Sequence, residues 1–332
     1  MDMETDDGAW WRCAYFAYLD SGLPLDHQDE DEATGRAIAS LQDTVSGFLD
    51  GALNFGTLKY RMDVASAESQ YTFPARTVSS TLSDIALGVP LDDLEPALRR
   101  AAVLPDGPGM AKGALMDLEE VLERAVARGT LERSLARPER WAELLACLWH
   151  IQDPGWWPLV SDQAIDYLRS RGDISRSEPA QDYAEYVIAA RRLAEILGAD
   201  LAALDHLLSS LGRDEIAVPG TDACFQDSMA RAEGFAAEGD TDRALESYER
   251  ALALRPQTPA ALRRKAELYA EKGLNMAAIG ELEVLVGMEP GDLEAHRTLV
   301  SLYRSQNMVR EHNVEVRRWK TLKEARLSPP GN

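Results

Sequence analysis

The stretch GDTDRALESYERALALRP (residues 239–256) decides the fold of the last third of the chain, because its landmark residues return at a fixed interval. The positions repeated 34 residues apart are Gly239 and Gly273, Ala244 and Ala278, and Pro256 and Pro290. Small residues at matched positions let two antiparallel helices approach closely, and the proline ends the second helix of each unit. This period therefore predicts stacked pairs of antiparallel helices.

The period and its residues resemble the tetratricopeptide repeat, whose unit is a helix–turn–helix pair of this length. The resemblance covers about residues 222–326. The second repeat, residues 259–292, keeps the glycine, alanine and proline but has Leu282 where the first repeat has Tyr248.

The third repeat departs further from the pattern. Asn307 replaces the glycine, His312 replaces the alanine, and no proline follows. A polar helix over residues 308–326 is expected to close the array as a solubilising cap.

The resemblance implies that the first helices of the repeats form a concave groove for a peptide or protein segment. Carried over from the family, the groove-facing positions are Gln226, Met229 and Glu233 in the first repeat, Arg263, Glu267 and Ala270 in the second, and Arg297, Ser301 and Arg304 in the third. The three arginines would form a cationic patch suited to an acidic segment or a carboxylate. The alternative is that they are solvated or paired with Glu267 and Glu294. Because Met229 and Glu233 occupy the first positions of the lysine/asparagine clamp found in chaperone-binding members, that ligand is not expected.

Helical spacing of apolar residues continues through the first two thirds, so the chain as a whole is predicted to be all-α. The clearest amphipathic stretches are residues 36–49, 114–128, 138–149 and 182–197. Ser161 and Asp200 are predicted N-caps. The stretch QYTFPARTVSS (residues 70–80) is expected to be an ordered loop, because Pro74 and the Thr/Ser run oppose a helix.

Two glycines and a proline in GRDEIAVPGTD mark a change of composition and predict a domain boundary. The predicted organisation is an acidic N-terminal segment with a short apolar helix (1–33), an α-helical domain (34–211), a linker (212–222), the repeats with their cap (223–326) and a tail (327–332).

The chain is strongly acidic. Its 332 residues contain 35 Lys and Arg against 56 Asp and Glu, a net charge of −21. Residues 1–33 hold ten carboxylates and one arginine, a net of −9, whereas residues 297–326 hold eight bases and three acids, a net of +5. Such a charge disfavours nucleic acid. The expected partner is a protein or peptide, and the patch of three arginines suits an acidic segment of it. An acidic start and short apolar runs predict a cytoplasmic protein without a membrane span, and leave the oligomeric state open.

Catalytic and cofactor motifs are missing from the sequence. No GxxxxGK[ST] or GxGxxG motif occurs, so no cofactor, metal or catalytic residue is predicted. His150 with Asp153 and Asp162 could form a metal or acid–base cluster, but chance proximity is the simpler interpretation. The cysteines Cys13, Cys147 and Cys224 are far apart in sequence, which argues against a disulfide framework.

Two pairs of tryptophans form a possible second contact surface. Trp10 and Trp11 begin a short apolar helix, and Trp156 and Trp157 lie in the turn QDPGWWP (residues 152–158). The alternative for both pairs is that they pack in the core.

Residues 47–211 resemble the helical N-terminal region of bacterial ATPases related to modified-cytosine restriction. The matching residues are Leu148, His150, Pro154, Pro158, Ser161, Leu168, Gly172, Tyr183, Leu193, Leu204 and Asp205. Asp162 and Gln163 depart from that pattern, and no ATPase follows. This resemblance implies a recognition role in a bacterial defence setting.

These observations lead to three functional hypotheses. The first is a non-enzymatic adaptor or scaffold that binds a protein segment in the repeat groove, in a bacterial defence complex. The alternative is a nucleic-acid-recognition subunit that recruits an effector through its repeats. The third is a hydrolase with an unrecognised carboxylate cluster.

Overall fold

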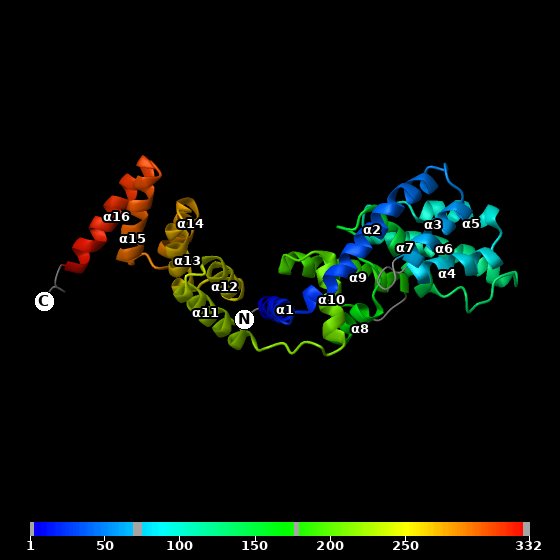
Figure 1. The fold of residues 1–332 in the computed structure, drawn as a ribbon, viewed down its shortest axis with the longest axis horizontal. Coiled ribbons are helices and arrows are strands. Elements are labelled where there is room, and N and C mark those ends of the chain that lie inside the picture. Colours follow the sequence, from blue (N-terminus) through cyan, green and yellow to red (C-terminus); the bar gives the residue numbers. More distant parts are fainter. Residues whose placement is uncertain (1–2, 69–74, 176–178, 328–332) are drawn as a thin grey trace. The chain divides into compact units, whose positions relative to one another are not determined.

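The computed structural model describes residues 3–68, 75–175 and 179–327, which form sixteen helices and no strand. The predicted all-α fold is confirmed (Figure 1). The first two thirds contain α1 (Met3–Asp20), α2 (Leu23–Leu49), α3 (Phe55–Glu68), α4 (Ala75–Gly88), α5 (Leu91–Ala101), α6 (Pro108–Ala127), α7 (Pro138–Gln152), α8 (Asp162–Arg171), α9 (Pro179–Leu197) and α10 (Leu201–Gly212). The last third contains α11 (Thr221–Glu238), α12 (Thr241–Leu254), α13 (Pro259–Glu271), α14 (Asn275–Met288), α15 (Leu293–Ser305) and α16 (Val309–Leu327).

The chain divides into two compact units. One unit is residues 17–217, and the other combines residues 1–16 with residues 218–332. The division after residue 217 falls within the stretch 212–222. The structure differs from the expectation of a separate N-terminal segment, because α2 runs through residue 33 without interruption. We call residues 17–217 the central unit and the other the repeat unit.

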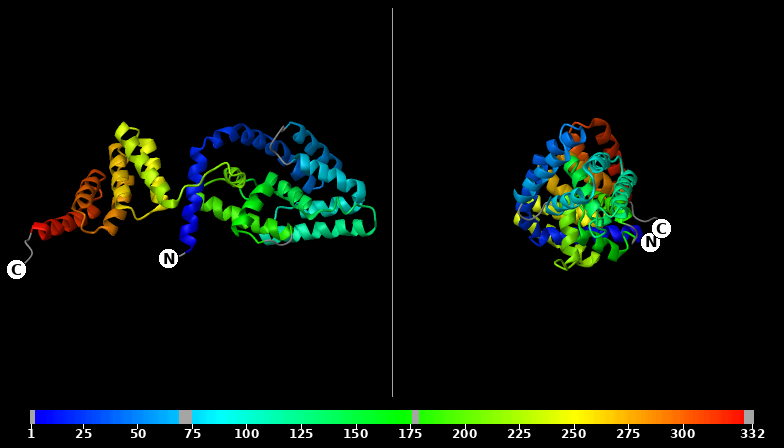
Figure 2. Two further views of the ribbon diagram at one scale, coloured as in Figure 1. Left: turned by 90° about the horizontal axis from the view of Figure 1, so that it is seen from below. Right: turned by 90° about the vertical axis from the view of Figure 1, so that its right-hand side faces the viewer.

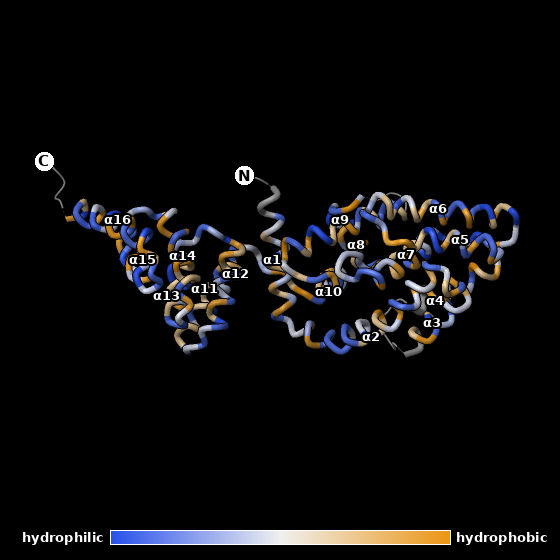
Figure 3. The backbone as a smooth tube through the Cα atoms, turned by 90° about the horizontal axis from the view of Figure 1, so that it is seen from above, coloured by the Kyte–Doolittle hydropathy of each residue, from blue (hydrophilic) through white to orange (hydrophobic). Residues whose placement is uncertain are grey.

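Helix α7 is the most buried helix of the central unit. Nine of its fifteen residues are buried, and it contacts α2, α4, α6 and α9. A helix that is apolar on nearly every side belongs in a core. Trp149 is fully buried, and its Nε1 donates a hydrogen bond to the carbonyl oxygen of Ala101 at 3.2 Å. The helices of each unit can be followed in the further views of Figure 2, and hydrophobic and hydrophilic stretches alternate along them (Figure 3).

The expected loop at residues 70–80 is wrong for its second half. Residues 69–74 lie outside the described residues, but helix α4 begins at Ala75. Val78, Leu82 and Ile85 are each 0% exposed. Their spacing of four and three residues places them on one helix face, and burial of that face outweighs the low helix propensity of serine and threonine.

Both predicted N-caps of the central unit are confirmed. Ser161 Oγ accepts a hydrogen bond from the backbone N–H of Ala164 at 3.3 Å and caps α8. Asp200 Oδ1 accepts one from the backbone N–H of Ala203 at 2.8 Å and caps α10. Each cap satisfies a donor that the first turn of a helix leaves without an intrahelical partner.

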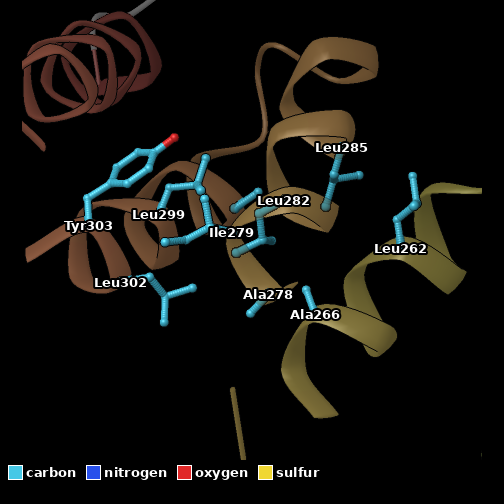
Figure 4. Close-up of a cluster of buried hydrophobic side chains, with 10 residues drawn as sticks. Leu262, Ala266, Ala278, Ile279, Leu282, Leu285, Leu299, Leu302 and Tyr303 are labelled. Atoms are coloured by element: carbon cyan, nitrogen blue, oxygen red, sulfur yellow. The ribbon is translucent and has the colours of Figure 1, made fainter. Parts of the chain in front are cut away.

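The repeat unit contains three consecutive pairs of packed helices, α11 with α12, α13 with α14 and α15 with α16. Ala244 and Ala278, the small residues of the period, are both 0% exposed. Figure 4 shows side chains of α13, α14 and α15 meeting in one cluster, with Ala278 and Leu282 of α14 between Ala266 and Leu299. The second and third repeats therefore share one buried apolar cluster.

Asn307 performs the backbone role of the glycine that it replaces. Its φ is 58°, close to the 81° of Gly239 and the 75° of Gly273 at the corresponding turns. Asparagine adopts this left-handed conformation more readily than most residues with a side chain. The third turn is therefore built like the first two.

The N-terminal helix packs on the first repeat. Ala9 and Cys13 of α1 share a buried cluster with Cys224 and Phe225 of α11 and Leu254 of α12. The thiols of Cys13 and Cys224, which are far apart in sequence, lie within hydrogen-bonding distance and are free. Residues 3–16 thus cover apolar surface at the start of the repeat array.

Candidate functional site

The nine predicted groove residues lie on α11, α13 and α15, the first helices of the three pairs, and we call them the first-helix row. Six are exposed, namely Gln226, Glu233, Glu267, Arg297, Ser301 and Arg304. Three are half-buried, namely Met229, Arg263 and Ala270. The row therefore presents mostly polar side chains to solvent.

Two of the half-buried members serve packing. Met229 packs against the cluster that includes Cys13 of α1 and against the cluster around Ala244. Ala270 packs against the cluster around Ala278. Their contact with solvent is limited because the same side chains fill space between helices.

Arg263 joins two successive repeats. Its Nη2 lies 2.6 Å from Asp292 Oδ2 and 3.6 Å from a carboxylate oxygen of Glu289. Asp292 is also the N-cap of α15, since its Oδ1 accepts hydrogen bonds from the backbone N–H groups of Glu294 and Ala295. Burial opposes ionisation of Asp292, but the contact with Arg263 and the cap hydrogen bonds lower the pKa of its carboxyl. Arg263 is thus engaged within the fold, and neither of the partners expected from the sequence is its main contact.

The cationic character of the row is concentrated on α15. Arg297 pairs with Glu294 three residues earlier, and both side chains are more than half exposed. Arg304 is exposed and has no ion pair with any residue in the described part of the chain. Glu267 is paired with Arg264, on its own helix. Exposed pairs of this kind are weak, so Arg297 and Arg304 are both accessible to an external carboxylate.

A tyrosine–glutamate contact that we did not predict repeats with the 34-residue period. Tyr269 Oη donates a hydrogen bond to Glu249 at 3.1 Å, and Tyr303 Oη donates one to Glu283 at 2.6 Å. Each contact links the second helix of one repeat to the first helix of the next. The available sequence signal was that Glu249 and Glu283, and likewise Tyr269 and Tyr303, lie one 34-residue period apart.

A buried histidine–glutamate contact joins α15 to the capping helix α16. His296 Nδ1 contacts Glu315, and His296 Nε2 lies 3.0 Å from the carbonyl oxygen of Pro290. Both ring nitrogens therefore face oxygen atoms of the fold. The pair lies against a crevice of about 770 Å³, whose lining also includes Tyr303. The polar groups at this crevice are thus largely satisfied within the fold.

One tryptophan of each pair is buried and the other is partly exposed. Trp11 and Trp157 are each 1% exposed, while Trp10 and Trp156 are half-buried. Trp157 lies against Trp149 with ring centroids 5.3 Å apart. The core interpretation therefore holds for Trp11 and Trp157.

The three residues that could have formed a metal or acid–base cluster have different main contacts. His150 Nδ1 contacts the carbonyl oxygen of Trp157 at 2.7 Å, and Asp162 acts electrostatically on Glu143. Asp153 follows the last residue of α7 as its C-cap. No group of three or more His, Cys, Asp or Glu side chains placed to hold a metal occurs among the residues that the structure describes.

Comparison with protein families supports the interpretation of the repeats. Residues 235–310 match the family described as tetratricopeptide repeat. A comparison with curated proteins gave no match. The resemblance of residues 47–211 to restriction-type ATPases receives no support and stays a prediction. Residues 235–310 contain α12, α13, α14 and α15 with the end of α11 and the start of α16, and they are thus similar to a family of helical repeats that generally mediates protein–protein interaction.

Proposed function

We propose that the protein is a non-enzymatic adaptor whose first-helix row binds an acidic segment of a partner protein. The observation that carries this proposal is the exposure of Arg297 and Arg304 on α15, the first helix of the third pair in a tetratricopeptide-like array. The two arginines lie seven residues, about two helical turns, apart and share one face of α15. Their guanidinium groups suit carboxylates in a bidentate geometry.

The charges along the row indicate how a segment would lie on it. The first repeat contributes Gln226 and Glu233, whereas the third contributes Arg297 and Arg304. Residues 297–326 carry a net charge of +5 in a chain whose total is −21. A segment with its acidic end on α15 and its neutral or basic end on α11 matches these charges best.

Charge reversal of the exposed arginines tests the proposal. Peptides selected from a display library on the full chain should be enriched in Asp and Glu. The double variant Arg297→Glu with Arg304→Glu should bind those peptides about tenfold or more weakly in fluorescence anisotropy, because two charge-assisted contacts become repulsive. We leave Arg263 unchanged, since its loss would also disturb the cap of α15.

Arg310→Glu is the matched control, because Arg310 is exposed on the second helix of the same pair, outside the first-helix row. The control should bind the selected peptides nearly as well as the unmodified chain. Equal losses of peptide affinity in the control and in the double variant would show that the overall charge, and not the first-helix row, causes the effect. Selected peptides without acidic enrichment would contradict the proposed partner chemistry.

The cellular setting is a further part of the proposal. A cytoplasmic place in a bacterial defence complex rests on the sequence resemblance and charge alone. In the described residues, no helix combines the length and the apolarity needed to cross a bilayer.

A further inference from the structure

The central unit contains a cavity of about 1100 Å³ between α2, the turn after α7, and the α9–α10 junction. This volume exceeds that of many small-molecule sites. Its lining combines apolar side chains, among them Ile38 and Leu201, with Arg191, Arg192 and His150 and with the carboxylates of Asp31, Glu195 and Asp200. Of these carboxylates, Asp31 contacts His206 and Asp200 caps α10. The cavity thus offers an apolar body with a few polar groups, as ligand sites usually do.

Arg191 is held in place, and no carboxylate among the described residues pairs with it. Its guanidinium lies over the ring of Trp156, 3.8 Å from the centroid, and its Nη1 donates to the Trp156 carbonyl oxygen at 3.3 Å. Within the described ranges of the chain, neither Arg191 nor the exposed Arg192 has an ion pair. Unpaired arginines are unexpected in a chain that has 56 acidic and only 35 basic residues. A stacked guanidinium is already ordered, so it would lose little entropy on binding an anion.

His150 supplies a hydrogen-bond acceptor beside this cation. Its Nδ1 lies 2.7 Å from the Trp157 carbonyl oxygen, so this nitrogen carries the proton and donates. Burial lowers the pKa of the imidazole, against the opposing effects of that hydrogen bond and of Asp153. At pH 7 the ring is therefore neutral, and Nε2 accepts.

The cation and the acceptor are fixed to consecutive residues of one turn. Arg191 bonds to the carbonyl of Trp156 and His150 to that of Trp157, and consecutive Cα atoms lie about 3.8 Å apart. A ligand that contacts both groups needs an anionic oxygen for Arg191 and an N–H donor for His150. A terminal carboxylate preceded by an amide N–H has this arrangement.

We propose that this cavity binds the free carboxylate of an N-acylated apolar amino acid, either as a small molecule or as the C-terminal residue of a peptide. Arg191, with Arg192 beside it, binds the carboxylate. His150 accepts the amide N–H, and the apolar lining receives the side chain. The crevice beside His296 is a weaker candidate, because its buried histidine and glutamate already satisfy each other.

Calorimetric titration of the full chain tests this site with acetyl-alanyl-leucine and its C-terminal amide. The free acid should bind with a dissociation constant below about 1 mM, and the amide at least about tenfold more weakly. Acetyl-leucine, titrated in the same way, distinguishes the two sources of the ligand. If it binds with nearly the same affinity as acetyl-alanyl-leucine, the site is assigned to a small molecule. If longer peptides bind clearly more tightly, the site is assigned to the C-terminus of a chain.

The variants Arg191→Gln and Arg191→Lys should each weaken binding of the free acid about tenfold, because lysine lacks the planar fork. Arg124→Gln on α6 is the matched control, since Arg124 is an exposed arginine outside the cavity lining. Should Arg191→Gln fail to fold, Arg192→Gln gives the same test at an exposed position. Arg297→Glu with Arg304→Glu should leave this binding unchanged, which separates the site from the first-helix row.

Any one of three results would overturn the proposal. The acid and the amide could bind equally, the Arg191 and Arg192 variants could both bind the acid as well as the unmodified chain, or no binding could be detected at about 10 mM ligand.

Discussion

Asp205 on α10 is a buried carboxylate whose burial is incompletely compensated. Its Oδ1 has no hydrogen-bond partner within the residues described. Desolvation raises the pKa of this carboxyl, although His206, Ser161 and Arg213 act in the opposite direction. The folded state therefore binds the proton more tightly than the unfolded state, so ionisation of Asp205 destabilises the fold as the pH rises above the ordinary aspartate range.

We expect Asp205→Asn to stabilise the protein at pH 7, because the neutral amide keeps the shape of the side chain without the buried charge. A gain of about 1 kcal/mol would raise the melting temperature of a unit of this size by about 2–4 °C. At about pH 3, where the unfolded carboxyl is largely protonated, the gain should shrink or vanish. Thermal melts of both proteins across this range provide the measurement, and a gain independent of pH would contradict the assignment.

Single residues also show where sequence reasoning stops. The period placed Arg263 and Arg297 at equivalent positions, but it could not indicate that Arg263 meets Asp292, the N-cap of the next repeat. It likewise gave no sign that Arg191 stacks on Trp156, 35 residues away. Spacing identifies the face of a helix, whereas partners depend on which helices meet.

Helices with strong periodic patterns were the elements best predicted from sequence. The caps at Ser161 and Asp200 and the three helix pairs agree with expectation. The failure at residues 75–80 arose because a serine- and threonine-rich stretch was judged by propensity alone. Its burial against other helices depends on the tertiary fold, which local sequence does not reveal.

Enlarging Ala278 should disturb the stacking of repeats. Ala278 is 0% exposed and packs with residues of α13 and α14 in one cluster. Ala278→Leu should reduce the free energy of unfolding by about 1–3 kcal/mol through overpacking. Denaturant titration checks the change, and Ala277→Leu, on the exposed face of the same helix, should have little effect. Equal stability of the two variants would contradict the repeat register.

At the scale of the whole molecule, the repeat unit is built from both ends of the chain. No local pattern indicates that Cys13 meets Cys224, since the contact spans the entire central unit. The sequence predicted an apolar helix near residues 10–19 but could not assign its partner. Long-range pairing of this kind is decided by complementary surfaces and not by periodicity.

Removing residues 1–16 should expose Cys224. In the full chain this thiol is buried, and desolvation together with the hydrogen bond to Cys13 raises its pKa to about 12. We expect slow alkylation of Cys224 by iodoacetamide at pH 8, because the thiolate is scarce, and much faster alkylation after truncation. Mass spectrometry of the modified peptides measures both rates. Cys147, 0% exposed in α7, is the internal control and should stay unmodified, and an unchanged Cys224 rate would show that α1 does not cover it.

The contribution of α1 to the repeat unit has a consequence for synthesis. When Ala9 and Cys13 leave the ribosome, the surface that covers them, on α11 and α12, is still about 200 residues from being translated. At about 5–20 residues per second, that interval is roughly 10–40 s. During this time the central unit can fold while α1 waits with its apolar face uncovered. Nascent chains stalled between residues 217 and 254 should therefore be the species most in need of a chaperone, and release of that chaperone should follow completion of α12.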